Sequence, residues 1–276
     1  MENIVNNNKD EQSSTEHSSN NALDESLLND SKNVGELDID AIKEKAGGRY
    51  IRTIRSFVKR EGRLTKGQER ILAESPYLID HEAVNARWNL DALFGRTNQK
   101  RTLEIGFGDG ASLSKMAERE PDRDFLGLEV HRPGVGRLLL DVEEKGLTNI
   151  RAIDYDAVHI LKHCIPDESL ECVQVFFPDP WHKKKHNKRR IIQPAFVALI
   201  AQKLMKGGRL CLATDWEPYA EHMMEVMQSA PDYINSVDAS INGGFVMEPN
   251  HRMPTKFEAR GKRLGHGVWD LIFLKK

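Results

Sequence analysis

The chain has 276 residues, of which 39% are hydrophobic, so it is long enough to bury one sizeable core. Its formal charge of −2 hides an asymmetry, because residues 1–46 carry 11 acidic and 4 basic side chains and the remainder is net basic. No apolar run approaches the roughly 18 residues of a membrane span, and the first residues do not resemble a signal peptide. The three cysteines lack metal-ligand spacing, so we expect reduced thiols in a cytoplasmic protein.

Residues 1–40 are predicted to form a disordered acidic tail. Asn, Ser, Asp and Glu dominate this stretch, and it has almost no apolar periodicity. Such a composition cannot bury enough surface to offset the entropy cost of ordering. Two interpretations remain open: a tail that improves solubility, or a tail that lies on a basic face and competes there with a polyanion.

Residues 41–99 are interpreted as an N-terminal basic helical segment and a connector. Between residues 49 and 63, basic side chains recur three or four positions apart, so a helix would align them on one face: Arg49, Arg52, Arg55 and Lys59. The stretches TKGQER and SPYLI that follow are interpreted as irregular. The segment either covers the core or contacts a polyanion.

From about residue 100 to residue 276, strand patterns alternate with helix patterns. Buried strands are predicted at 102–105, 122–130, 149–156, 170–177 and 209–215, and an antiparallel strand at 268–275. A helical pattern follows each of the first five strands. The helix that begins near Ile191 is predicted to end at the glycine pair Gly207–Gly208. This alternation predicts a mostly parallel, doubly wound α/β sheet.

Polar residues stand at the carboxyl ends of all five parallel strands, where ligands bind in such sheets. They are Glu104 and Gly106 after the first strand, Glu129, then Asp154 or Asp156, and finally Asp179 and Asp215. Because these ends meet at one edge of the sheet, we expect the side chains to surround one ligand site.

The first turn contains Gly106, Gly108 and Gly110, which lets the backbone pass close to a ligand. Glu129 is well placed to accept hydrogen bonds from a ribose diol, a feature shared with NAD-binding domains. The spacing is G-x-G-x-G and not G-x-G-x-x-G, and an acid at Glu104 would repel a pyrophosphate. The same acid suits the cationic methionine end of S-adenosylmethionine, which is therefore the predicted cofactor.

Asp156, just before a predicted helix, is the better candidate to bind the exocyclic amine of an adenine, and Asp154 is the alternative. A helix cap or a turn is the structural explanation for either residue. Further along, the sequence FFPDPWHKKKHNKRR (176–190) ends a strand in a carboxylate beside an aromatic ring and continues as a basic cluster. A planar ligand near Asp179 and phosphate near the cluster would explain both features, whereas a plain turn and a solvated charged face would be the structural explanations. Trp181 either stacks on an unstacked base or forms a buried wall.

Several motifs together resemble the bacterial tRNA (guanine-N7-)-methyltransferase family from about Arg49 to Lys276. They are LEIGFGDG (103–110), GLEVH (127–131), FFPDPWHK (176–183), HNKRR (186–190), ATDWEPYA (213–220) and TKFEARGKRLGHGVWDL (255–271). The resemblance implies a Rossmann-like, seven-stranded sheet with an antiparallel C-terminal strand. It also implies methyl transfer from S-adenosylmethionine to N7 of guanosine 46 in the variable loop of tRNA, by a monomer or homodimer without an obligate protein partner.

The resemblance, with the glycine turn, also assigns site residues. The cofactor would be held by Glu104, Gly106, Gly108, Glu129, Asp156 and Asp179. The substrate would be bound by Lys183, Asp215, Thr255, Lys256, Phe257 and Glu258, and further RNA by Lys185, His186, Asn187, Lys188, Arg189 and Arg190.

Guanine N7 carries an in-plane lone pair, so its methylation needs no general base. Asp179, the predicted catalytic residue, would orient the purine and stabilise its developing positive charge. Histidine pairs four residues apart, such as His182 and His186, lack an apparent third ligand, so no metal is expected. The other hypotheses are a cofactor-binding RNA module without catalysis and an NAD-dependent oxidoreductase. The former leaves the strand-end acids unexplained, and the latter lacks an obvious hydride-transfer motif.

Overall fold

The computed structural model describes residues 45–46, 49–50, 55–58, 62–97, 100–250, 252–253, 258 and 267–276. The chain divides into two units, residues 1–53 and residues 54–276. The described residues of the first unit pair as two short antiparallel strands, β1 (Lys45–Ala46) and β2 (Arg49–Tyr50). The predicted acidic tail of residues 1–40 lies outside the described residues, so its disorder stays a prediction.

The helix predicted for residues 49–63 is wrong wherever the structure describes this stretch. Arg49–Tyr50 is a strand, and residues 55–58 are not helical. The sequence RYIRTIRSFV is rich in β-branched and aromatic side chains, which disfavour a helix and outweigh the spacing of the charges. The carbonyl groups of Arg55 and Ser56 also accept hydrogen bonds from side chains elsewhere in the second unit, and these contacts stabilise the non-helical conformation.

Helix α3 (Lys66–Glu74) occupies part of the stretch that was predicted to be irregular. It begins with a capping box, in which the Thr65 hydroxyl accepts from the amide of Gln68 and the Gln68 side chain accepts from the amide of Thr65. The side chain of Gln68 also donates to the carbonyl of Pro133 at 2.9 Å. The Thr-x-x-Gln signature is present in the sequence, so this helix was predictable from its N-cap.

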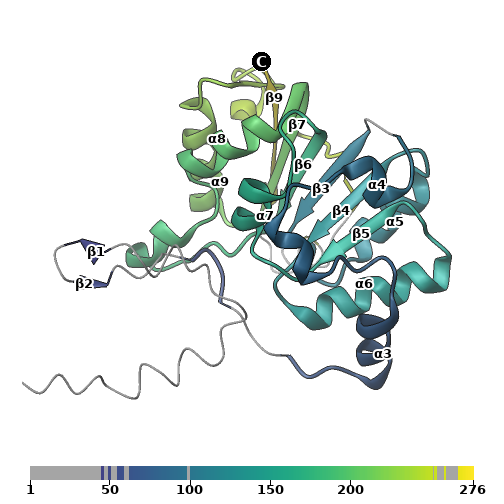
Figure 1. Ribbon diagram of the computed structural model, residues 1–276. Helices are drawn as coiled ribbons and strands as arrows, with labels where there is room; N and C mark the ends of the chain where they lie inside the picture. Colours follow the sequence, from purple (N-terminus) through teal and green to yellow (C-terminus); the bar gives the residue numbers. More distant parts are fainter. Residues whose placement is uncertain are drawn as a thin grey trace, which may run out of the picture. The chain divides into compact units, whose positions relative to one another are not determined.

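The second unit is built on a seven-stranded sheet with the order β5-β4-β3-β6-β7-β9-β8 (Figure 1). Five neighbouring strands are parallel, whereas β9 pairs antiparallel with both β7 and β8. The predicted mostly parallel sheet with an antiparallel C-terminal strand is confirmed. The strands are β3 (Arg101–Ile105), β4 (Asp124–Leu128), β5 (Ile150–Ile153), β6 (Leu170–Phe176), β7 (Leu204–Thr214), β8 (Tyr233–Asn235) and β9 (Trp269–Lys275).

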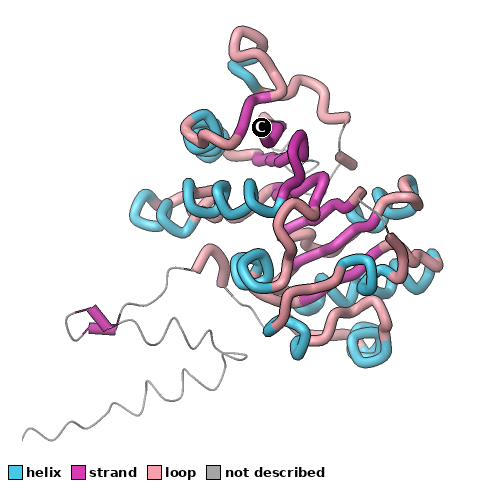
Figure 2. The backbone as a smooth tube through the Cα atoms, turned by 45° about the horizontal axis from the view of Figure 1, so that its top comes forward, coloured by secondary structure: helices cyan, strands magenta, loops and turns pink. Residues whose placement is uncertain are grey.

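Helices cover both faces of this sheet (Figure 2). Successive residues of a strand point to opposite faces of the sheet, so that Phe125 and Leu126 of β4 belong to different hydrophobic clusters. The part of the chain that the structure describes contains no helix long and apolar enough to cross a membrane. The remaining helices are η1 (His81–Asn85), α4 (Leu90–Phe94), α5 (Ala111–Arg119), α6 (Arg132–Lys145), α7 (Ala157–His163), η2 (Lys184–Arg189), α8 (Pro194–Lys203), α9 (Glu217–Gln228) and η3 (Asn242–Gly244).

Helix α8 ends earlier than the sequence predicted. Its last residue is Lys203, and the glycine pair at 207–208 lies inside β7, where the pairing with β6 is interrupted by a register shift. Lys203 is buried, and its ammonium group lies 2.5 Å from a carboxylate oxygen of Asp167. This ion pair stabilises the C-terminal end of α8 at Lys203, upstream of the glycine pair.

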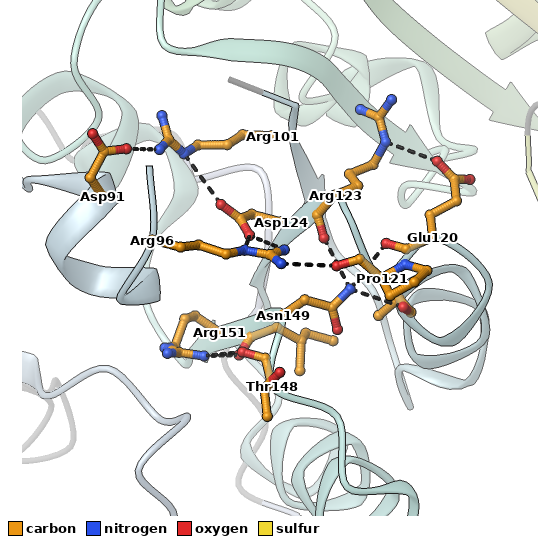
Figure 3. A network of polar contacts seen from close by, with 12 residues as sticks. Asp91, Arg96, Arg101, Glu120, Pro121, Arg123, Asp124, Thr148, Asn149 and Arg151 are labelled. Atoms are coloured by element: carbon orange, nitrogen blue, oxygen red, sulfur yellow. Dashed lines mark hydrogen bonds and ion pairs between the residues drawn. The ribbon is translucent and has the colours of Figure 1, made fainter. Parts of the chain in front are cut away.

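A network of arginines and acids holds the amino ends of β3 and β4 (Figure 3). Asp124 begins β4 and is fully buried, and its Oδ1 accepts a hydrogen bond of 2.6 Å from Nε of Arg96. Arg101, the first residue of β3, lies between Asp124 and Asp91 and pairs with both. The network lies at the end of these strands opposite to their carboxyl ends, so we interpret it as structural.

Candidate active site

A cleft of about 810 Å³ opens at the carboxyl ends of the parallel strands. It brings together most of the polar residues that the sequence placed at strand ends. Residues 56–58, which the sequence did not single out, also line it. The predicted site residues on its wall are Gly106, Gly108, Glu129, Asp156, Asp179 and Asp215.

The glycine turn forms one wall of the cleft. Gly106 and Gly108 have φ angles of 77° and 64°, and an added Cβ at either position would meet no atom within 4 Å. A backbone that is left-handed and open on its outer side accommodates a ligand in close contact. Oε2 of Glu129 accepts from the amide of Gly108 at 2.9 Å, and Oε1 accepts from the amides of Val130 and His131. The backbone therefore fixes the Glu129 carboxylate at the end of β4.

Glu104 lies in β3, just before this turn in the sequence; it is not among the residues that line the cleft, and it is only 3% exposed. Its Oε2 has no hydrogen-bond partner within the described ranges. Desolvation raises the pKa of its carboxyl group to about 8, and the charges of Cys172 and Glu129 add to the effect. A buried carboxyl group with an unpartnered oxygen suits a cationic ligand group, so the donor set fits the aminoacyl end of S-adenosylmethionine.

The structure separates the two candidate carboxylates that follow β5. Asp154 is buried, and its Oδ1 lies 2.7 Å from Nε2 of His81. Asp156 instead lines the cleft and caps α7, with its Oδ1 accepting from the amides of Val158 and His159. Asp156 is therefore better placed for a ligand, and Asp154 has a structural environment.

Asp179 is exposed at the cleft, between two prolines. Its Oδ1 accepts a hydrogen bond of 3.0 Å from the amide of Trp181. The loop is conformationally strained, because Phe177 and Trp181 have φ angles of 51° and 48° without being glycine. Asp215, on the loop between β7 and α9, lines the same cleft and supplies a second carboxylate.

Trp181 lines the cleft and is also held from outside it. Its indole N–H donates to the carbonyl of Ser56 at 3.1 Å, and the Arg189 guanidinium lies 4.0 Å from its ring centre. Arg189 also donates to the carbonyl of Arg55 at 3.0 Å. These contacts make Trp181 a wall in this structure, with one ring face covered by Arg189. Both carbonyl acceptors belong to the main chain, so the side chains of residues 55 and 56 gave no sequence signal for this contact.

The basic cluster forms the short helix η2 and its flanks. Four of its cations are exposed: Lys183, Lys184, Lys185 and Lys188. His186, Asn187 and Arg189 are half-buried. Arg190 is only 5% exposed and donates to the carbonyls of Pro180 and Pro218, so its donors face the protein in this structure and its contact with RNA stays a prediction. Its guanidinium group is occupied by the protein backbone.

The C-terminal motif is only partly described. Thr255, Lys256 and Phe257 lie outside the described residues, so their substrate contacts stay predictions. Glu258 is buried, and its Oε2 accepts from Arg252 at 2.5 Å. Arg252 also donates to both carboxylate oxygens of Asp270 on β9, at 2.6 and 2.8 Å. The described contacts of Glu258 are thus structural.

Comparisons with known proteins show which families and proteins the chain resembles. A family model described as "Putative methyltransferase" matches residues 98–271. A tRNA (guanine-N(7)-)-methyltransferase of Idiomarina loihiensis is 55% identical over 228 residues, which is 83% of this chain and 91% of the relative. Proteins with the same name from Alcanivorax borkumensis (54% over 234 residues; 85% and 96%) and Aeromonas hydrophila (56% over 226 residues; 82% and 94%) are similarly close.

Proposed function

The chain belongs to the tRNA (guanine-N7-)-methyltransferase family, and we propose that it transfers the methyl group of S-adenosylmethionine to N7 of guanosine 46 in tRNA. The observation that carries this proposal is the composition of the cleft. The cleft is lined by Gly106, Gly108 and Glu129 together with Asp179 and Asp215, and exposed lysines follow Asp179 in the sequence. Together these features suit a nucleoside cofactor, a purine and a phosphate backbone.

The cofactor would be held by the residues whose donor and acceptor groups fit it. Glu129 would accept from the ribose diol, Asp156 from the adenine amine, and Glu104 from the ammonium group, while Gly106 and Gly108 allow close approach. When bound, S-adenosylmethionine supplies an electrophilic methyl group on a sulfonium ion. The protein must then exclude other nucleophiles and align N7 with that methyl group.

The chemistry at N7 requires orientation and charge stabilisation. Because the N7 lone pair lies in the ring plane, no proton has to be removed before attack. Asp179 would accept from the N1–H and N2–H₂ edge of the guanine, and its negative charge would stabilise the ring as it becomes cationic. Asp215 faces the same cleft and would add to this field. We therefore assign Asp179 an orienting and electrostatic role.

RNA would be gripped by the exposed lysines at 183–185 and 188. Such contacts with phosphate provide affinity that falls with salt and contribute little sequence discrimination. The family resemblance assigns Lys183 to the substrate nucleotide, and its exposed side chain is compatible with that role. We further propose that the protein acts as a monomer or homodimer without a second kind of subunit.

The proposal is tested by incubating the protein with methyl-labelled S-adenosylmethionine and an unmodified tRNA transcript. Chemical cleavage at N7-methylguanosine then locates the label. We expect one cut in the variable loop, and its loss in Asp179→Ala. Label incorporated without that cut would contradict the N7 assignment. Binding of S-adenosylhomocysteine without any transfer would instead support a non-catalytic RNA module, and binding of NADH alone would support an oxidoreductase.

A further inference from the structure

Arg190 is the last residue of the basic stretch, yet it does not belong to the exposed surface of that stretch. It is 5% exposed, whereas Lys184, Lys185 and Lys188 are exposed. Its Nε donates to the carbonyl of Pro180 at 2.9 Å, and its Nη1 donates to the carbonyl of Pro218 at 3.3 Å. The sequence alone gives no reason to separate it from its neighbours.

The two carbonyl groups belong to the two loops that carry the cleft carboxylates. Pro180 directly follows Asp179, and Pro218 lies three residues after Asp215 at the start of α9. One guanidinium group therefore connects the Asp179 loop with the Asp215 loop. Its planar face also lies over the buried ring of Tyr219, with 4.7 Å between Cζ and the ring centre.

The peptide between Pro180 and Trp181 is held on both sides. Its carbonyl oxygen accepts from Arg190, and its N–H donates to Oδ1 of Asp179 at 3.0 Å. A cation on the carbonyl polarises the peptide and strengthens its N–H as a donor. The same peptide precedes Trp181, whose φ of 48° requires support from its surroundings. Arg190 thus acts on the Asp179 carboxylate through one peptide group.

We propose that Arg190 is a positioning residue for methyl transfer, which fixes the Asp179 carboxylate and its spacing from Asp215. This inference rests on the proposed function, because it assigns Asp179 to the purine. A guanidinium group is required, since it donates in two directions while stacking on Tyr219. A lysine at this position would supply one point charge and would not hold both loops.

The test compares the wild-type protein with Arg190→Lys and Arg190→Met in steady-state methyl transfer to a tRNA transcript at two salt concentrations. For Arg190→Lys we expect kcat to fall by about tenfold or more, the loss typical of one charge-assisted hydrogen bond, with KM for tRNA changed less than about twofold. Lys188→Met is the comparison from the adjacent helix η2, and it should raise KM and reduce the salt dependence of binding. Arg137→Met, an exposed arginine on α6, is the control for loss of a surface cation.

A double-mutant cycle distinguishes positioning from a general effect on folding. If Arg190 acts through Asp179, the variant Asp179→Asn/Arg190→Lys will lose little more kcat than Asp179→Asn alone. Additive losses would overturn the proposal, as would a kcat for Arg190→Lys equal to the wild-type value. The pattern expected of Lys188→Met would also overturn it, since Arg190 would then be an RNA contact. Absence of methyl transfer by the wild-type protein would instead contradict the proposed function. Arg190→Lys keeps the charge, so the test does not depend on Arg190→Met folding.

Discussion

Gly134 and Gly108 approach so closely that a Cβ on Gly134 would lie 2.1 Å from the carbonyl oxygen of Gly108. Gly134 is in the first turn of α6, and Gly108 is in the glycine turn whose amide donates to Glu129. The helix start therefore forms the back of the proposed cofactor site. The backbone of the glycine turn cannot move away from the cleft, because Gly134 at the start of α6 packs against Gly108.

This contact predicts that Gly134→Ala weakens cofactor binding. The added methyl group must push the backbone of Gly108, since no side chain is available to move instead. We expect at least a tenfold loss of affinity for S-adenosylhomocysteine, measured by calorimetric titration. Gly67→Ala is the matched control, because the nearest atoms to its Cβ would be in the side chains of Leu140 and Thr65, at the ordinary contact distances of 3.9 and 4.0 Å. That change, inside α3, should stabilise the fold by roughly 0.5–1 kcal/mol and leave affinity unchanged. If Gly134→Ala and Gly67→Ala bound S-adenosylhomocysteine with equal affinity, the cofactor site would not lie at the glycine turn.

Glu129→Gln should also reduce cofactor affinity, for a different reason. Three backbone amides point at the carboxylate, and an amide side chain would turn one N–H₂ group toward these donors. A hydrogen bond to a charged group contributes roughly 1.5–3 kcal/mol, so affinity for S-adenosylhomocysteine should fall about tenfold or more. The measurement is again calorimetric, and adenine alone should bind the variant and the wild-type protein alike. An undiminished affinity for S-adenosylhomocysteine would remove Glu129 from the ribose site.

The raised pKa of Glu104 predicts that the stability of the cofactor-free protein depends on pH. Its folded-state pKa is raised to about 8, so the carboxyl group stays protonated in the native state at pH values where it ionises in the unfolded state. Its contribution to the free energy of unfolding is complete below the unfolded pKa near 4.3 and is lost as the pH rises through about 8. Glu104→Gln removes this titration. Between pH 5 and pH 8, the free energy of unfolding measured by urea titration should therefore fall for the wild-type protein relative to that of Glu104→Gln. A constant difference between the two would contradict the raised pKa.

Arg252→Met should destabilise the fold strongly. The substitution leaves the buried carboxylates of Asp270 and Glu258 without their shared cation, and breaking such a pair costs roughly 3–5 kcal/mol. The free energy of unfolding from urea titration measures the loss. Adding Asp270→Asn should recover part of it, because one of the two negative charges that Arg252 neutralises disappears. The exposed Arg137→Met is the control, and equal effects of the two arginine substitutions would contradict a structural role for Arg252.

The parallel strands and their polar ends were predictable because both follow from local pattern. Buried strands are apolar runs, and residues such as Glu129 and Asp215 stand where those runs end, so the sheet topology itself brings them to one cleft. The sequence favoured Asp156 over Asp154 because Asp156 stands just before a helix, but it could not show what Asp154 contacts. That contact is His81, which lies 73 residues away from Asp154 in the chain and bonds to it.

Other features depended on contacts that no local pattern encodes. Arg190 is indistinguishable in sequence from Arg189, and only the positions of Pro180 and Pro218 explain its burial. The stretch at 55–58 was predicted to be helical from the spacing of its charges, whereas its carbonyl groups are bonded to Trp181 and Arg189. By contrast, α3 was missed although its Thr65–Gln68 capping box is visible in the sequence.

The most direct test of the central claim compares two tRNA transcripts that differ by one atom. One carries guanosine at position 46, and the other carries 7-deazaguanosine there, which has a carbon in place of N7. With labelled S-adenosylmethionine, the account predicts methyl transfer to the first transcript and none to the second, with similar affinity for both because the base edge facing Asp179 is unchanged. Equal labelling of the two transcripts would contradict attack by N7 of guanosine 46.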